Sequence, residues 1–235
     1  MERAESYDYV VISQVKKCFG DETVLQETNL TLQEGRVYGI VGNNGSGKTV
    51  LMKCICGFLP VTSGEIYVGG KAIGKEVDFP KSLGVIIETP GFLGEYTGRK
   101  NLEILAALNK KISGGEITKV LEVVGLNPDL KKPVAKYSLG MRQRLGIAQA
   151  IMEDPEILVL DEPFNGLDMR GVEDIRRILL DLKQQGKTIL LASHNSEDIR
   201  ILCDEVYVMD AGIIQKMKKT SVISGEDSGE ERKES

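Results

Sequence analysis

Apolar and polar residues alternate along two stretches near the N-terminus, and short continuous apolar runs follow them. Residues 7–19 and 23–33 alternate as β-strands with one buried face do, which predicts an antiparallel pair. RVYGIVG at 36–42 is an apolar run that leads into a glycine-rich turn, and we expect a helix over 48–58 after it. Two further strands are predicted before residue 88, in EIYVGG and SLGVIIE.

The pattern changes to helical spacing over residues 90–154. Apolar residues recur every three or four positions in NLEILAAL, ITKVLEVVGL and LGIAQAIM, and no segment of this block reads as a convincing strand. The block therefore predicts a helical subdomain that is inserted into a larger domain.

Strands and helices alternate again after residue 154. ILVLDEP and TILLASH predict buried strands, helices are expected over 171–185 and 196–203, and VYVMDAGIIQKM predicts a hairpin. Apolar strands that alternate with helices indicate a largely parallel sheet covered on both faces. The predicted fold is α/β, with an N-terminal antiparallel β subdomain and the helical insert. We expect one domain over residues 1–220 and a disordered acidic tail at 221–235, which lacks apolar residues.

Composition and charge argue against several classes of protein. The chain has 235 residues, 41% of them hydrophobic, which suffices for a single core, and its net charge of −5 argues against a nucleic-acid partner. The acidic start lacks the apolar stretch of a signal peptide, and the apolar runs are far shorter than the roughly 20 residues of a membrane span, so we expect a cytoplasmic protein. The four cysteines have the spacing of neither a zinc site nor a disulfide framework and are expected to be reduced, mostly buried thiols: Cys18, Cys54, Cys56 and Cys203.

A phosphate-binding loop is predicted where the third strand ends. GNNGSGKT, residues 42–49, matches GxxxxGK[ST] between a predicted strand and a predicted helix. In such a loop the backbone N–H groups surround a phosphate, Lys48 reaches the β and γ oxygens, and Thr49 ligates magnesium. The alternative, a tight turn that binds no ligand, would need neither the Lys48 nor the Thr49 side chain. The predicted nucleotide-binding residues of the loop are Gly42, Asn43, Asn44, Gly45, Ser46, Gly47, Lys48, Thr49 and Val50.

Two carboxylates and the only histidine follow the next buried strands. Asp161 is suited to binding magnesium or its waters, and Glu162 to orienting and deprotonating an attacking water. His194 follows LLAS and should emerge at the same edge of the sheet, where it can position water and phosphate. The alternatives are solvated loop charges and a surface histidine. The neighbouring phosphate loop favours catalytic roles for Lys48, Glu162 and His194.

The order of these segments resembles the ATP-binding subunit of an ABC transporter over about residues 7–217. The phosphate loop, the helical insert, YSLGMRQR at 137–144, ILVLDEPFNGLD and SH carry the resemblance. It implies a P-loop NTPase that binds ATP and Mg²⁺, forms a head-to-tail dimer over two MgATP and drives a separate membrane permease from the inner face of the cell membrane. Ser138 and Gly140 would then contact the ATP held by a second copy. The alternative for Ser138 is an ordinary helix N-cap.

Two more positions match the family. Phe19 stands where an aromatic ring stacks on adenine, and its alternative is a core phenylalanine. Asp168, in NGLD, resembles the aspartate that communicates across the dimer and can at the same time cap the helix that follows it.

The sequence departs from the family pattern in two places. YSLGM replaces the usual LSGGQ, so that Leu139 and Met141 stand where a glycine and a glutamine are usual, and Gln143 is out of register. Glu88 occupies the position of the glutamine that usually links the nucleotide site to the permease, where a carboxylate can bind magnesium or its water. Both variations resemble a bacterial branch that exports drugs or antimicrobial peptides and confers self-immunity.

Two rival functions remain at this point. A soluble ABC-type ATPase of DNA repair or translation usually carries two cassettes or a long coiled coil, and neither is present in this sequence. A P-loop kinase would make YSLGMRQR a coincidence. A permease partner distinguishes transport from both.

Overall fold

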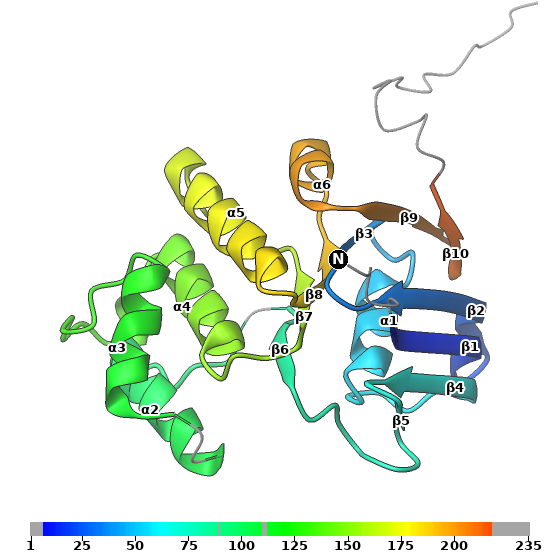
Figure 1. Cartoon of the computed structure of the whole chain (residues 1–235), viewed down its shortest axis with the longest axis horizontal. Coiled ribbons are helices and arrows are strands. Elements are labelled where there is room, and N and C mark those ends of the chain that lie inside the picture. Colours follow the sequence, from blue (N-terminus) through cyan, green and yellow to red (C-terminus); the bar gives the residue numbers. More distant parts are fainter. Residues whose placement is uncertain (1–6, 89, 110–111, 218–235) are drawn as a thin grey trace, which may run out of the picture.

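The computed structural model describes residues 7–88, 90–109 and 112–217. Its first sheet is the predicted N-terminal β subdomain, and it is antiparallel throughout, with strand order β2-β1-β4-β5 (Figure 1). The predicted pairing of residues 7–19 with 23–33 is confirmed. The strands are β1 (Asp8–Phe19), β2 (Glu22–Gln33), β4 (Ser63–Val68) and the short β5 (Lys71–Ala72).

The second sheet has six strands and is largely parallel. Its order is β10-β9-β3-β8-β7-β6, and only β10 runs antiparallel to its neighbour. Because parallel strands end at the same edge, the loops after β3, β6, β7 and β8 meet there. These strands are β3 (Val37–Val41), β6 (Leu83–Ile86), β7 (Ile157–Asp161), β8 (Thr188–Ala192), β9 (Glu205–Asp210) and β10 (Ile213–Lys216).

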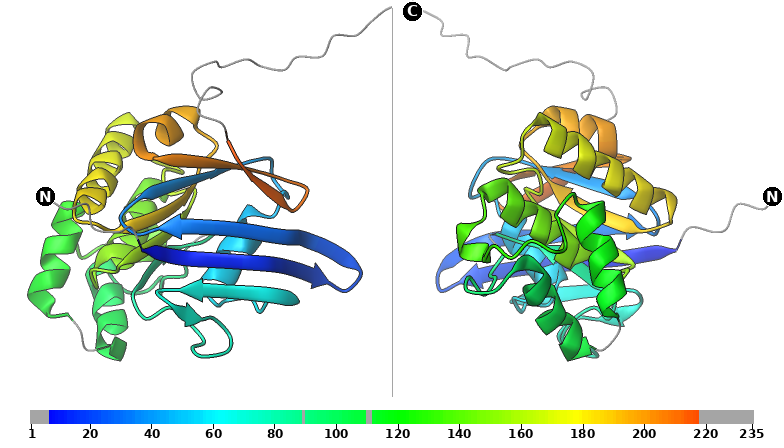
Figure 2. Two further views of the ribbon diagram at one scale, coloured as in Figure 1. Left: turned by 45° about the vertical axis from the view of Figure 1, so that its right-hand side comes forward. Right: turned by 90° about the vertical axis from the view of Figure 1, so that its left-hand side faces the viewer.

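The helical insert lies at the end of the molecule opposite the antiparallel sheet (Figures 1 and 2). It holds α2 (Gly98–Asn109), α3 (Gly114–Val123), a 3₁₀ turn (Val134–Lys136) and α4 (Leu139–Ile151). Within the described part of 90–154 there is no strand, as the helical spacing predicted.

Both faces of the six-stranded sheet are buried. Leu158 and Leu160 of β7 pack into the core beneath the helical insert and α5 (Met169–Gln184). Ile157 and Val159 point to the opposite face, into a second core that contains α1 (Lys48–Ile55) and the inner residues of β1 and β2. The helix α1 is therefore held between the two sheets, and this arrangement fixes the phosphate loop that precedes it.

Element boundaries differ slightly from those predicted. The helix expected over 48–58 ends at Ile55, because the chain turns at Gly57, whose N–H donates to the Cys54 carbonyl at 3.1 Å. The helix expected over 171–185 starts two residues earlier, at Met169, because Asp168 caps it. The short α6 (Ser196–Leu202) ends one residue before the predicted 196–203. All four cysteines are free thiols, as predicted.

The described helices are all too short or too polar to cross a membrane. The tail predicted at 221–235 lies outside the described residues, so its disorder stays a prediction.

Candidate functional site

The phosphate loop joins β3 directly to α1. Gly42 has a φ of 153°, and a Cβ there would lie 2.1 Å from the Met209 carbonyl oxygen, so only glycine fits the first position. The Lys48 ammonium donates to the carbonyls of Gly42 at 2.7 Å and Asn43 at 2.9 Å. The lysine therefore folds back over the loop, and its ammonium is held at the start of the loop by these two carbonyl groups.

Thr49 and Asp161 meet between the phosphate loop and the end of β7. The Thr49 hydroxyl donates to Asp161 Oδ2 at 2.6 Å, across 112 residues of sequence. This contact brings together two of the three predicted magnesium ligands.

Glu162 and His194 meet one residue beyond β7 and two beyond β8. His194 Nε2 lies 3.2 Å from Glu162 Oε1, and the His194 backbone N–H faces Glu162 Oε2 at 3.5 Å. The imidazole contact falls outside hydrogen-bond geometry, since Glu162 Oε1 is buried without a hydrogen-bond partner among the described residues. Burial raises the pKa of the Glu162 carboxyl, Asp161 raises it further, and the neighbouring His194 opposes the shift.

These groups line one cavity of about 390 Å³. Asp161, Glu162 and His194 face the loop residues across it, and Val24 of β2 closes one side. Six of the nine predicted loop residues line it: Asn44, Gly45, Gly47, Lys48, Thr49 and Val50. The sheet edge thus assembles the phosphate loop and the acidic strand end as predicted.

The cavity suits a phosphate and a divalent cation. The Ser46 hydroxyl in the loop is buried and has no hydrogen-bond partner in the described structure, which leaves it free to bond a phosphate oxygen. No group of three His, Cys, Asp or Glu side chains in the described residues forms a closed metal cage. The hydroxyl of Thr49 and the carboxylate of Asp161 supply hard oxygen ligands, which fits Mg²⁺ that takes its other ligands from phosphate and water.

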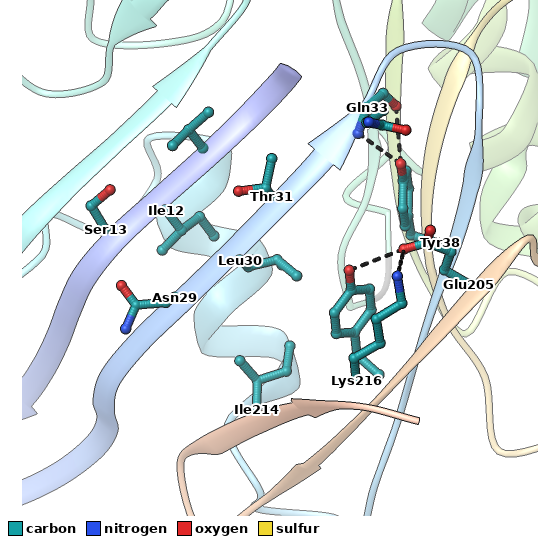
Figure 3. A pocket seen from close by; sticks show the side chains of 12 residues that line it. Ile12, Ser13, Asn29, Leu30, Thr31, Gln33, Tyr38, Glu205, Ile214 and Lys216 are labelled. Atoms are coloured by element: carbon teal, nitrogen blue, oxygen red, sulfur yellow. Dashed lines mark hydrogen bonds and ion pairs between the residues drawn. The ribbon is translucent and has the colours of Figure 1, made fainter. Parts of the chain in front are cut away.

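A larger cavity, of about 600 Å³, lies between β2 and the β9–β10 hairpin (Figure 3). Its polar wall is tied together by Glu205, which pairs with Lys216 at 2.8 Å and accepts from the Tyr207 hydroxyl at 3.2 Å. None of the predicted site residues lines it. The predicted chemistry therefore belongs to the smaller cavity.

Ser138, Gly140 and Asp168 lie together on a different surface. Ser138 Oγ accepts from the Met141 N–H at 3.2 Å and caps α4. A Cβ on Gly140 would come within 2.8 Å of the Gly166 carbonyl oxygen, so the start of α4 packs tightly on the loop that precedes Asp168. Asp168 Oδ1 accepts from the Gly171 N–H at 2.8 Å and caps α5. The capping alternatives for Ser138 and Asp168 are thus confirmed, and neither residue lines the phosphate cavity of its own chain.

Phe19 lies at the end of β1 with 47% of its surface exposed, which contradicts the core alternative. The Lys17 ammonium lies 4.7 Å from the ring centroid. The ring therefore has surface available for a ligand, although it does not line the cavity itself.

Glu88 is turned away from the other predicted magnesium ligands. Its carboxylate pairs with the Lys53 ammonium of α1 at 2.5 Å, its φ is 61°, and it is absent from the cavity lining. The structure does not bring it to Thr49 and Asp161.

Sequence reasoning missed the contact that ties α4 to the acidic strand end. The Gln143 side chain is 7% exposed and donates to the carbonyl oxygens of Pro163 at 2.9 Å and Glu162 at 3.4 Å. Gln143 is out of register with the family motif, so the resemblance assigns it no role. The signal available was helical spacing, since Gln143 stands four and seven residues before the buried Ile147 and Ala150 and so shares their face of α4.

The family match follows the same residues. The family model described as "ABC transporter" matches residues 25–165, from β2 through the phosphate loop and the helical insert to the acidic strand end. The chain belongs to this family.

The relatives are ATP-binding proteins of bacterial transporters. The chain is 43% identical over 206 residues to the uncharacterized ABC transporter ATP-binding protein YybJ of Bacillus subtilis (strain 168), covering 88% of this chain and 94% of that one. It is 42% identical to the bacitracin transport ATP-binding protein BcrA of Enterococcus faecalis, over 87% of this chain and 68% of that one. It is 36% identical to the lantibiotic transport ATP-binding protein SrtF of Streptococcus pyogenes, over 86% and 88%. The chain is an ABC transporter ATP-binding protein and an ATPase.

The fold matches solved cassettes. A dimeric ATP-binding cassette, in a post-hydrolysis state bound to ADP and phosphate, superposes with a TM-score of 0.80 at 22% identity and covers 89% of this chain and 98% of that one. A nucleotide-free cassette from an ABC transporter gives 0.76 at 27% identity, over 88% and 90%. The predicted fold class is thereby confirmed.

Proposed function

We propose that this chain binds MgATP at the phosphate cavity, dimerises over two nucleotides and drives a membrane permease that exports peptide antibiotics of the bacitracin or lantibiotic type. The observation that carries the nucleotide part is the meeting of Lys48, Thr49, Asp161 and Glu162 at one sheet edge.

The residues of the cavity divide the work of hydrolysis. Lys48 and the loop N–H groups bind the β- and γ-phosphates, and Thr49 and Asp161 hold the magnesium ion. When bound, the ion neutralises charge on the phosphate oxygens. Glu162 accepts a proton from the attacking water, and its raised pKa moves it toward the range of a general base that works near neutral pH. His194 positions the water and the γ-phosphate.

The surface around Ser138 supports the dimer. Leu139 is 61% exposed and Met169 is 84% exposed, and each stands directly beside a capping residue, Ser138 or Asp168. Large apolar side chains at such exposure favour burial against a partner. The Ser138 cap and the first N–H groups of α4 form an anion site, which suits the γ-phosphate held by a second copy. Phe19 completes the nucleotide site by stacking on adenine.

The peptide substrate follows from the relatives. Proteins that share 42% and 36% identity with this chain carry out bacitracin and lantibiotic transport. Since the described residues hold no membrane-spanning helix, a separate permease must carry the substrate, with the ATPase on the cytoplasmic face. Glu88 in the usual glutamine position then serves the coupling of the two proteins.

Growth in peptide antibiotics tests the proposal. A host strain that lacks the gene is complemented with the wild type, with Glu162→Gln, or with Glu173→Gln, which removes an exposed carboxylate of α5. We expect the wild type and Glu173→Gln to restore growth in bacitracin or a lantibiotic and Glu162→Gln to fail. Equal sensitivity of the deleted and complemented strains to both peptides would reject the substrate class and leave the ATPase assignment intact.

A further inference from the structure

A buried carboxylate lies behind the loop that carries His194. Asp198 of α6 has 1% of its surface exposed. Arg176 of α5 donates from Nε to Asp198 Oδ1 at 2.7 Å, and the Ser193 hydroxyl lies 3.3 Å from Asp198 Oδ2. A charge removed from water in this way is retained only when it is paired, so the ion pair fixes the relative position of α5 and α6.

The same carboxylate anchors the backbone on both sides of His194. Ser193 is 3% exposed, and its hydroxyl accepts from the Asn195 N–H at 3.1 Å. The Asn195 side chain in turn accepts from the Glu197 N–H at 2.8 Å and caps α6. The turn 193–195 is therefore tied to Asp198 and to the start of α6.

His194 itself has little to hold it. Its side chain is 53% exposed, and the hydrogen bond and ion-pair contact that this residue makes in the described structure are both with Glu162. A side chain so exposed takes its place from the backbone that carries it, which is the turn fixed by Asp198.

We propose that the Arg176–Asp198 ion pair is the positioning element that holds His194 against Glu162 during ATP hydrolysis. The inference rests on the proposed role of His194. Because α5 begins at Met169 and is capped by Asp168, the pair also links His194 to the helix that starts on the Ser138 surface. Arg176 and Asp198 act through His194 and do not touch the nucleotide.

The chain provides a matched control on the same helix. Asp174, also on α5, pairs with Arg144 of α4 at 3.0 Å, in an arginine–aspartate pair whose carboxylate is more exposed than that of Asp198. That pair ties α5 to the helical insert and has no contact with the turn 193–195 among those described. Asp198→Asn and Asp174→Asn thus make the same chemical change in two ion pairs of α5.

The test measures turnover and the state of the imidazole together. Because the chain has one histidine, a protein purified without a histidine tag and labelled at histidine gives one set of imidazole NMR signals. We expect Asp198→Asn to shift these signals and to lower kcat for ATP about tenfold or more, with KM nearly unchanged, since misplacement of a catalytic group costs turnover. Asp174→Asn should change neither. Arg176→Lys, which keeps the charge but loses the planar fork, should show the Asp198→Asn effects more weakly.

His194→Ala distinguishes failure of the proposed role of His194 from failure of the positioning role of the Arg176–Asp198 pair. If it turns over ATP at the wild-type rate, the proposed role of His194 fails, and this inference fails with it. If His194→Ala is inactive while folded Asp198→Asn and Arg176→Lys keep both the wild-type signals and the wild-type kcat, the positioning role alone is overturned.

Discussion

Glu162 is the residue that we propose as the general base, and its surroundings suit that role. Its side chain is 22% exposed, His194 lies 3.2 Å from one oxygen, and its φ of 50° turns it out of the strand that Asp161 ends. The two adjacent carboxylates therefore suit different roles. Asp161 bonds the Thr49 hydroxyl, as a magnesium ligand beside the phosphate loop would, and Glu162 does not.

Replacing Glu162 by Gln should abolish turnover and leave binding. The amide keeps the size of the side chain but cannot accept the proton of the attacking water, so we expect kcat to fall by roughly 10²-fold or more. ATP affinity, measured by fluorescence of a labelled nucleotide, should stay close to that of the wild type. Near-normal turnover would show that another group is the base.

The same substitution should stabilise the fold in a pH-dependent way. Burial raises the Glu162 pKa in the folded state, so the protonated side chain favours folding and that contribution is lost as the pH rises through the raised value. Glutamine is neutral throughout. We expect the Tm of Glu162→Gln to exceed that of the wild type at pH 8, with an excess that shrinks as the pH falls toward the ordinary pKa of glutamate. An excess that grows on acidification would contradict the direction of the shift.

Among the helices and strands, the start of α4 combines the most unusual set of features. It combines a serine cap, an exposed leucine and a glycine packed against Gly166, and it does not line the phosphate cavity of its own chain. We expect such features where the nucleotide held by a second copy of the chain binds against the start of α4.

Ser138→Arg should block dimerisation and spare nucleotide binding. A bulky side chain at this cap would occupy the place of the partner's γ-phosphate, whereas the chain's own phosphate loop is untouched. Ser113→Arg is the matched control, because Ser113 caps α3 of the same insert. In the Glu162→Gln background, size-exclusion chromatography with ATP should show a monomer for Ser138→Arg and a dimer for Ser113→Arg. A dimer from both would remove α4 from the interface.

Hydrophobic periodicity predicted the strands of this fold, but it could not predict the contacts between distant elements. Alternation in 7–33 and the apolar runs at β3, β7 and β8 predicted the strands because each buries one or both faces. The phosphate loop could be predicted because its geometry demands particular residues. The Lys53–Glu88 and Arg176–Asp198 pairs could not, since partners 35 and 22 residues apart are set by tertiary packing alone.

At the scale of the whole molecule, two surfaces of one chain are incomplete in complementary ways. The cavity at the phosphate loop has donors for phosphate but no group from α4, and the start of α4, which we propose as an anion site, does not line that cavity. In the proposed head-to-tail dimer, the α4 surface of each copy meets the phosphate cavity of the other. The two-fold symmetry of such a dimer makes this contact occur twice.

The most direct test is the mass of purified Glu162→Gln protein by light scattering, at micromolar concentration, with and without MgATP. We expect the variant to hydrolyse ATP too slowly to lose it, so a dimer that forms over ATP should persist. We expect a monomer without nucleotide and a dimer with it. A protein that binds ATP yet stays monomeric would contradict the shared-nucleotide dimer, and with it the role of Ser138 and Gly140.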